Sequence, residues 1–478
     1  MFQGAHHNVI HNPQFIDLSY SGTGLEALLG KSMPNAFHDS SARYPPPRCH
    51  LDTRKDYIAK VMDWAHGDSH LGEPILWMYG PFGVGKSAVA QSCAEALEIK
   101  HKLAATLFFS RSFADRDDPQ RIFTSIAYQI AIQCDAFSRI IAARIDRDPA
   151  LVTKTPSRQF EELLVRPLHQ IDTAARELDG LIVIIDGLDE CRGTSEQCEI
   201  IGIIAASARD RTTPFRWFIT SRPEAPIVRA MHSTAVFPTS FHLELPVSRK
   251  IDHEILIYLT DEFSKIREHE GLPAPWPPEE VIALLVERTA GLWIYATTII
   301  RFIEDKNSFG PRDQLRIVYD FAIKVSAKGG SNNPLAEMDF FYVLIMEQIP
   351  LKIKSTVLKV LLIHSLHSGI FHPLRIATIL HLSEEQFHRC CSYIQSVMKV
   401  EGSRGLRSMS MHFYHTSFLD FMKDPDRSNG LCMYGDFMMR YRRELLEWLH
   451  MVCTLSTGIV FLPYRSTLPY TKKSVCSV

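Results

Sequence analysis

The chain has 478 residues, a length typical of about three domains. Its hydrophobic fraction of 46% and charged fraction of 22% are ordinary for a globular protein, and its formal net charge of −2 argues against a basic surface that binds nucleic acid or anionic membranes. The N-terminus lacks a basic region followed by an apolar core, no uncharged apolar segment is long enough to span a bilayer, and the cysteines lack zinc-ligand spacing. We therefore expect a cytoplasmic protein without a membrane span.

The first 50 residues are rich in Gly, His, Asn, Ser and Pro, which predicts a tail and a linker with one short helix at 24–29. Within the tail, residues 1–22 have scattered apolar positions that fit either a self-assembling segment or a disordered tail. From Asp52 onward, apolar residues recur at helical spacing, which predicts a helix before the first strand.

The segment Gly80–Ser87 reads G-P-F-G-V-G-K-S and matches the phosphate-binding pattern G-x-x-x-x-G-K-[ST]. An apolar run, Ile75–Tyr79, precedes it and a helical pattern follows it, which is the context in which this pattern binds phosphates; a plain glycine turn is the alternative. The glycines let backbone N–H groups point at an anion, Lys86 would reach the β- and γ-phosphates, and Ser87 would hold Mg²⁺. The expected nucleotide contacts are Gly80, Pro81, Phe82, Gly83, Val84, Gly85, Lys86 and Ser87.

The next predicted elements are a strand at 103–110, a helix that begins near Asp118, a helix at 160–178 and a buried strand at 181–185. This last strand is a continuous apolar run that ends in Asp186, at the edge where parallel sheets bind ligands. Asp186 would hold Mg²⁺ opposite Ser87, and Asp189 or Glu190 would orient or deprotonate the attacking water. A turn-capping role for Asp186 is the alternative.

The run Phe215–Thr220 predicts another buried strand, which is followed by Arg222. An arginine at this position would face the γ-phosphate and report its presence, whereas a surface arginine in a turn is the alternative. A last strand is expected at 241–245. Alternating strands and helices indicate an α/β fold, in which helices cover both faces of a parallel sheet.

After residue 248 the pattern becomes helical, with helices expected at 251–267, 279–289 and 292–303. From residue 338, helices alternate with a short strand near 411–414, which is the spacing of a small winged-helix unit. We therefore divide the chain into a tail and linker (1–50), a P-loop nucleotide-binding domain (51–248), a helical domain (249–330), a winged-helix-like domain (331–430) and a C-terminal tail (431–478).

Three segments together resemble the NACHT domain, in the form found in fungal proteins with a nephrocystin-3-like N-terminal region. They are the phosphate loop, L-I-V-I-I-D-G-L-D-E-C at 181–191 and W-F-I-T-S-R-P-E at 217–224. The resemblance extends over roughly residues 20–430 and includes H-T-S-F-L-D-F at 415–421.

The resemblance also implies roles for individual residues. The implied catalytic residues are Asp189, Glu190 and Arg222, and the implied metal ligands are Ser87 and Asp186. Thr53 and Arg54 would lie over the base, and His415 would contact the β-phosphate of ADP; a histidine packed at the end of a strand is the alternative. Trp293 stands where related proteins carry a proline beside the adenine.

The function implied by the resemblance is a signalling switch controlled by ATP and ADP, with GTP as an alternative nucleotide and Mg²⁺ as cofactor. ATP binding would open the protein and allow self-association, slow hydrolysis would reset it, and its further partners would be unidentified signalling proteins. The setting would be non-self recognition or programmed cell death in a fungus. Two other functions stay open: a metabolic P-loop enzyme such as a nucleotide kinase, and a nucleotide-stabilised adaptor without turnover.

Overall fold

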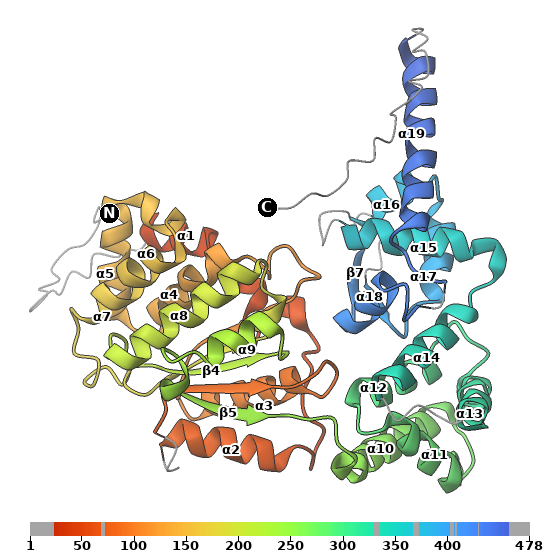
Figure 1. The fold of residues 1–478 in the computed structure, drawn as a ribbon, viewed down its shortest axis with the longest axis horizontal. Coiled ribbons are helices and arrows are strands. Elements are labelled where there is room, and N and C mark those ends of the chain that lie inside the picture. The colour runs from red at the N-terminus through yellow and green to blue at the C-terminus, as the bar shows by residue number, and fades with distance from the viewer. Residues whose placement is uncertain are drawn as a thin grey trace, which may run out of the picture.

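The computed structural model describes residues 23–67, 72–327, 334–366, 372–401, 406, 409–428 and 430–457. The expectations for residues 1–22 and for the end of the C-terminal tail, 458–478, lie outside these ranges. An α/β region with a central sheet comes first, and a helical region with a small β-hairpin follows it (Figure 1). Across the described part of the chain, no helix is both long and apolar enough to traverse a bilayer.

The central sheet has five parallel strands in the order β2-β3-β4-β1-β5. Its strands are β1 (Ile75–Tyr79), β2 (Leu103–Phe108), β3 (Ile182–Asp186), β4 (Arg216–Ser221) and β5 (Ser240–Glu244). All of β3 is buried, because helices cover both faces of the sheet and adjacent strands cover both of its edges. The predicted parallel α/β sheet is confirmed, and the ends of its strands differ from the predicted ends by at most two residues.

Successive residues of each strand face two separate cores, as the period of a strand requires. Met78 and Ile184 share one core with α2 and α3, whereas Trp77 and Ile185 share the other with α4 and α8. The helices of the α/β region are α1 (Thr23–Gly30), α2 (Lys55–His66), α3 (Lys86–Ile99), α4 (Ile122–Gln133), α5 (Asp135–Arg147), α6 (Pro156–Phe160), α7 (Arg166–Leu168), α8 (Thr194–Asp210) and α9 (Ala225–Met231). Helices therefore lie on both faces of the sheet, as Figure 1 shows.

One predicted helix has the wrong bounds. The helix expected at 160–178 begins at Pro156, passes through a π-helical turn and ends at Leu168. Beyond that point Asp172 accepts a hydrogen bond from the N–H of Ala175 at 3.1 Å. Because aspartate side chains stabilise turns in this way, the chain turns where the sequence pattern suggested a continuing helix.

The second half of the chain is a helical region with one hairpin, in agreement with the predicted class of fold. Its elements are α10 (Asp252–Glu270), α11 (Glu279–Thr289), α12 (Trp293–Ile303), α13 (Pro311–Ala327), α14 (Pro334–Glu347), α15 (Leu351–Leu366), α16 (Pro373–Ile379), α17 (Glu384–Ser392), β6 (Met398–Glu401), β7 (Ser410–Phe413), α18 (Thr416–Lys423) and α19 (Asp436–Thr457). The strands β6 and β7 pair antiparallel. Part of the expected C-terminal tail is therefore helical, and α19 projects away from the hairpin (Figure 1).

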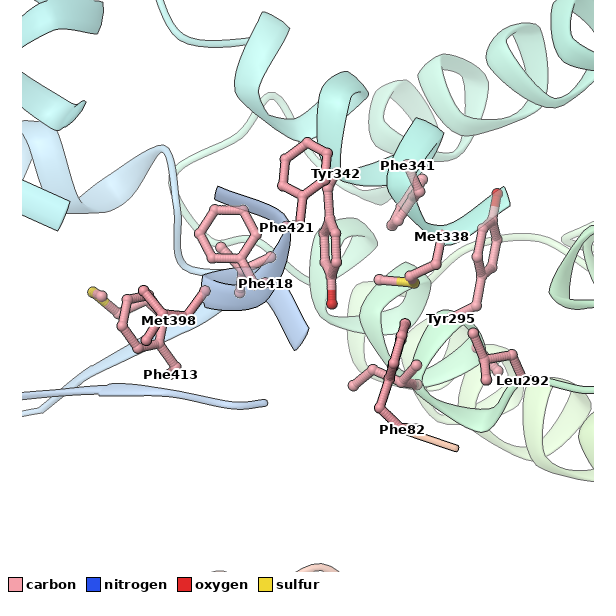
Figure 2. Close-up of a cluster of buried hydrophobic side chains, with 14 of the residues drawn as sticks. Phe82, Leu292, Tyr295, Met338, Phe341, Tyr342, Met398, Phe413, Phe418 and Phe421 are labelled. Carbon is pink, nitrogen blue, oxygen red and sulfur yellow. The ribbon is translucent and has the colours of Figure 1, made fainter. Parts of the chain in front are cut away.

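A single hydrophobic core joins the two regions, running from α3 through α12 and α14 to the hairpin and α18. Figure 2 shows part of it: Phe82, from the loop after β1, lies near Leu292 and Met338, and aromatic side chains continue the cluster toward β7. The rings of Tyr342 in α14 and Phe418 in α18 have centroids 5.1 Å apart. The ring centroid of His415, the residue before α18, lies 6.1 Å from that of Phe82, so the same core also brings α18 to the α/β region.

Candidate functional site

The phosphate-binding loop connects β1 to α3 and is held in place from outside. Gly83 and Gly85 have φ angles of 73° and 97°, which favour glycine, and Gly85 immediately precedes the first residue of α3. The N–H of Ile294, in α12, donates a hydrogen bond to the carbonyl oxygen of Gly83 at 3.1 Å. A Cβ atom on Gly83 would overlap the side chain of Ile294, so this position has room only for glycine.

Lys86 lies within the turn of this loop. Its Nζ donates hydrogen bonds to the carbonyl oxygens of Gly80 and Pro81, each at 2.7 Å. Burial lowers the pKa of Lys86 to about 8, an effect that the nearby carboxylate of Asp189 opposes. A phosphate held by the N–H groups at the start of α3 would supply the negative charge that the two carbonyls lack.

Asp186 and Ser87 meet at the carboxyl edge of the sheet. Asp186 is only 3% exposed, and its Oδ1 accepts a hydrogen bond from the Thr220 hydroxyl at 2.6 Å. The Ser87 hydroxyl also hydrogen-bonds the Asp186 carboxyl group, and burial raises the pKa of that group. The two side chains offer the oxygen ligands that Mg²⁺ prefers, and this ion usually takes its remaining ligands from substrate phosphates and water.

Within the described residues, no group of three or more His, Cys, Asp or Glu side chains forms a metal site. Ser87 and Asp186 contribute one hydroxyl and one carboxyl group, a donor set that fits an ion shared with a phosphate.

The two acidic residues after β3 have different surroundings. Asp189 accepts a hydrogen bond from the backbone N–H of Arg222 at 2.9 Å, and its Oδ2 is 3.3 Å from Nε of the same residue. Glu190 accepts hydrogen bonds from the backbone N–H of Arg111 at 3.2 Å and from the Thr416 hydroxyl at 3.3 Å. Burial and the charge of Asp189 raise the pKa of Glu190 to about 7. Asp189 thus anchors an arginine, and Glu190 has the pKa suited to a general base.

Arg222 follows β4 and reaches across to α18. Its two terminal nitrogens donate hydrogen bonds to Oδ2 of Asp420 at 2.7 Å and to the Thr416 hydroxyl at 2.6 Å. Burial opposes the charge of Arg222, but the carboxylates of Asp420 and Asp189 outweigh that effect and raise its pKa. The surface-arginine alternative does not describe this side chain, which is 17% exposed and paired on both sides.

Sequence reasoning did not identify Arg111, which follows β2. Its guanidinium lies 3.4 Å from Oδ2 of Asp189 and 3.6 Å from Oδ1 of Asp420. Arg111 and Arg222 therefore share both carboxylates. The available signal was positional: β2 pairs with β3, so a residue shortly after the end of β2 can lie beside the acidic pair. No sequence signal linked either arginine to Asp420, which lies 198 residues beyond Arg222 along the chain and still further from Arg111.

His415 caps α18 and lies beside the phosphate-binding loop. Its Nδ1 accepts a hydrogen bond from the N–H of Ser417 at 3.1 Å, so in the neutral ring Nε2 carries the proton. Burial, together with the charges of Arg222 and Lys86, lowers the pKa of His415 well below its usual value. The ring centroid lies 6.1 Å from that of Phe82 in the loop. His415 is therefore neutral, with one N–H available as a donor.

Thr53 and Arg54 lie on the other side of the loop. The Thr53 hydroxyl donates a hydrogen bond to the carbonyl oxygen of His50 at 2.7 Å and so stabilises a local turn. Arg54 donates a hydrogen bond to the carbonyl oxygen of Val84 at 2.7 Å, and its backbone N–H donates one to Glu254 of α10 at 3.1 Å. Arg54 thus ties the phosphate-binding loop to the helical region, and Thr53 supports the turn that positions it.

Comparison with known proteins identifies part of the chain. Residues 58–222 match the family model described as "Nephrocystin 3, N-terminal". Comparison with curated proteins gave no match.

Several solved structures resemble the chain weakly. The Walker-type ATPase of Pyrococcus abyssi has 13% identity and a TM-score of 0.38, over 78% of this chain and 97% of that one. Cdc6p from Pyrobaculum aerophilum has 12% identity and a TM-score of 0.34, over 82% and 98%. Drosophila ORC bound to DNA has 12% identity and a TM-score of 0.35, over 78% and 93%. Similarities of this size carry no argument about function.

The range matched by the family model contains the phosphate-binding loop, the strand β3 that ends in Asp186, and Arg222 after β4. These three features lie at one edge of a parallel sheet whose strand order brings β4 between β1 and β3. Residues 58–222 are therefore a nephrocystin-3 N-terminal region of the NACHT type, with the fold of a P-loop NTPase.

Proposed function

We propose that this protein is a switch controlled by ATP and ADP, in which the γ-phosphate of ATP competes with Asp420 for Arg222. The observation that carries the proposal is the 2.7 Å contact between Arg222 and Asp420 of α18. Arg222 directly follows β4, next to the strand that leads into the phosphate-binding loop. A guanidinium in this position can pair with a phosphate or with Asp420. Because only one of these pairings holds α18, the bound nucleotide is coupled to the position of α18.

In this proposal ADP leaves the contacts to α18 in place, because ADP has no γ-phosphate to attract Arg222. His415 adds a hydrogen bond from its Nε2–H to the β-phosphate in the same state. ATP, with Mg²⁺ held by Ser87 and Asp186, draws Arg222 toward the γ-phosphate and weakens the contacts to α18. Hydrogen bonds between charged groups are worth about 1.5–3 kcal/mol each, so exchanging them is enough to change which state is populated.

Slow hydrolysis would return the protein to the ADP state. Glu190 would take the proton from the attacking water, while Asp189 keeps Arg222 beside the sheet. Self-association of the ATP state, a signalling role in a fungus and a cytoplasmic location follow from the resemblance to fungal NACHT proteins and are part of the same proposal. Titration of the protein with ATP and with GTP would show which of the two nucleotides it binds more tightly.

The test is the size of the purified full chain in different nucleotides. We expect a monomer with ADP and Mg²⁺, and a larger species with a slowly hydrolysed ATP analogue and Mg²⁺, measured by light scattering at several protein concentrations. Turnover of ATP should be slow and should not increase when phosphoryl acceptors are added. Fast transfer to an acceptor would instead establish a metabolic kinase, and an unchanged size with no turnover would establish a nucleotide-stabilised adaptor.

Glu190→Gln is expected to bind ATP normally and to hydrolyse it at least about 100-fold more slowly, because a general base contributes about 10²–10⁴-fold. The pH dependence gives a second readout. With a pKa of about 7, Glu190 is mostly protonated at pH 6 and mostly ionised at pH 8, and only the ionised form accepts a proton. The kcat/KM for ATP should therefore rise between pH 6 and pH 8 in the wild type.

This rise should be missing in any residual activity of Glu190→Gln. Glu199→Gln, on the exposed side of α8, makes the same chemical change away from the site and should leave both the rate and the pH profile unaltered. If Asp189→Asn abolishes turnover while Glu190→Gln retains it, the roles of the two acids are the reverse of those proposed.

A further inference from the structure

We propose that Phe82, the third residue of the phosphate-binding loop, is the positioning residue through which phosphate binding reaches α14 and the segment after α18. The inference rests on the switch proposed above and names a contact that transmits it. Phe82 is 9% exposed, although residues of loops generally lie at the surface. In Figure 2 it projects from its loop into the core between the two regions, near Leu292 and Met338.

Two guanidinium groups from different parts of the chain contact this ring. The Cζ atoms of Arg222 and Arg427 each lie 5.8 Å from the centroid of the Phe82 ring, within the range of cation–π interactions. Arg427 also donates two hydrogen bonds to the carboxylate of Asp339 in α14, at 2.9 and 2.7 Å. The ring thus contacts both Arg222, which is proposed to bind the γ-phosphate, and Arg427, which is hydrogen-bonded to α14.

The backbone before Phe82 is connected directly to Lys86. Nζ of Lys86 donates a hydrogen bond to the carbonyl oxygen of Pro81, which belongs to the peptide group that joins Pro81 to Phe82. A β- or γ-phosphate that pairs with Lys86 would compete for this hydrogen bond and free that peptide group to rotate. Because the Phe82 ring is attached to the same peptide, its position relative to Arg427 depends on what Lys86 binds.

The two loop residues after Phe82 are held by hydrogen bonds from outside the loop. Gly83 accepts a hydrogen bond from the N–H of Ile294 at 3.1 Å and packs so closely against that side chain that a Cβ atom would overlap it. Val84 accepts a hydrogen bond from Arg54 at 2.7 Å. Movement that begins at the peptide between Pro81 and Phe82 is therefore directed into the core between the regions. A phenylalanine that only filled space would not connect nucleotide affinity to Arg427.

The test is a double-mutant cycle between Phe82 and Arg427, with the ratio of the affinities for an ATP analogue and for ADP as the readout. Coupling is reciprocal, so a residue influenced by the nucleotide must itself influence nucleotide preference. We expect Arg427→Gln in the otherwise unchanged chain to alter the affinity ratio by about two- to tenfold, which lies within the range for one cation–π contact. In Phe82→Leu, which keeps an apolar side chain, the same substitution should change the ratio by less than about twofold.

Controls separate coupling from loss of folding. Phe82→Trp retains an aromatic face, so Arg427→Gln should again change the affinity ratio in that background. Phe263→Leu replaces a buried phenylalanine of α10, and in that background Arg427→Gln should have the same effect as in the otherwise unchanged chain. Arg375→Gln, at an exposed site in α16, should not change the affinity ratio.

An effect of Arg427→Gln that is equally large in Phe82→Leu, or no effect in the wild type, would overturn the coupling through Phe82. Either result would still be compatible with the proposed switch, which is tested separately by the nucleotide-dependent change in size. A wild-type protein that does not change size with nucleotide would overturn the switch itself.

Discussion

Lys86→Ala is expected to weaken the binding of both ATP and ADP by about 30-fold or more while the protein stays folded. Removing one member of a partly buried, charge-assisted contact costs about 2–5 kcal/mol, and Lys86 is the cation that the loop places among its own carbonyl groups. The fold should tolerate the change because burial lowers the pKa of Lys86, so the folded protein gains little from keeping this charge in the absence of a phosphate.

The measurement is a titration with a fluorescent ADP analogue, followed by competition with unlabelled ATP and ADP. Lys100→Ala, at the exposed residue that caps the C-terminal end of α3, removes the same kind of charge away from the loop and should bind both nucleotides normally. A melting temperature near that of the wild type would show that Lys86→Ala is folded. Wild-type affinity in folded Lys86→Ala would disprove the assignment of the loop as the phosphate-binding site.

The sequence predicted those parts of the site whose geometry is set by residues next to one another along the chain. The eight residues Gly80–Ser87 carry their own glycines, lysine and hydroxyl, and the strand before them and the helix after them are set by local apolar patterns. The strand ending in Asp186 was predicted for the same reason, since a continuous β-branched run is typical of a strand buried on both faces. Its place between β2 and β4 is a finding of the structure.

The parts that the sequence did not predict depend on segments far apart in the chain. Arg222 meets Asp420 only because the core around Phe82 and Tyr342 holds α18 over the strand ends. The difference between Asp189 and Glu190 arises in the same way: Arg222 occupies one carboxylate, while burial raises the pKa of the other. Sequence patterns of period two or 3.6 contain no information about such contacts.

Local patterns also failed where side chains compete with the backbone. The helix expected at 160–178 ends ten residues early, at Leu168, and Asp172 forms a turn soon after that point. Conversely, the expected C-terminal tail contains α19, in which Met438, Tyr441 and Leu445 recur at helical spacing.

Asp420→Asn is expected to release α18 and to favour the self-associating state even with ADP present. The substitution keeps the shape and a hydrogen-bond acceptor but removes the charge that Arg222 and Arg111 share. Charge-assisted hydrogen bonds are about twice as strong as neutral ones, so the closed state should lose roughly 1–2 kcal/mol, which is about a five- to thirtyfold shift in the equilibrium. ADP should dissociate faster by a comparable factor, because the closed state is the one that holds it.

Light scattering in ADP and the rate of ADP release after mixing with excess unlabelled nucleotide give the two readouts. Asp426→Asn makes the same change of charge six residues further along, at an exposed position after α18, and should behave like the wild type. If Asp420→Asn stays monomeric and releases ADP at the wild-type rate, the contact between Arg222 and Asp420 is only a structural ion pair. In that case the γ-phosphate does not compete with Asp420, and the nucleotide state must reach the C-terminal helices by another route. Phe82 of the phosphate-binding loop offers one, through its contacts with Arg427 and His415.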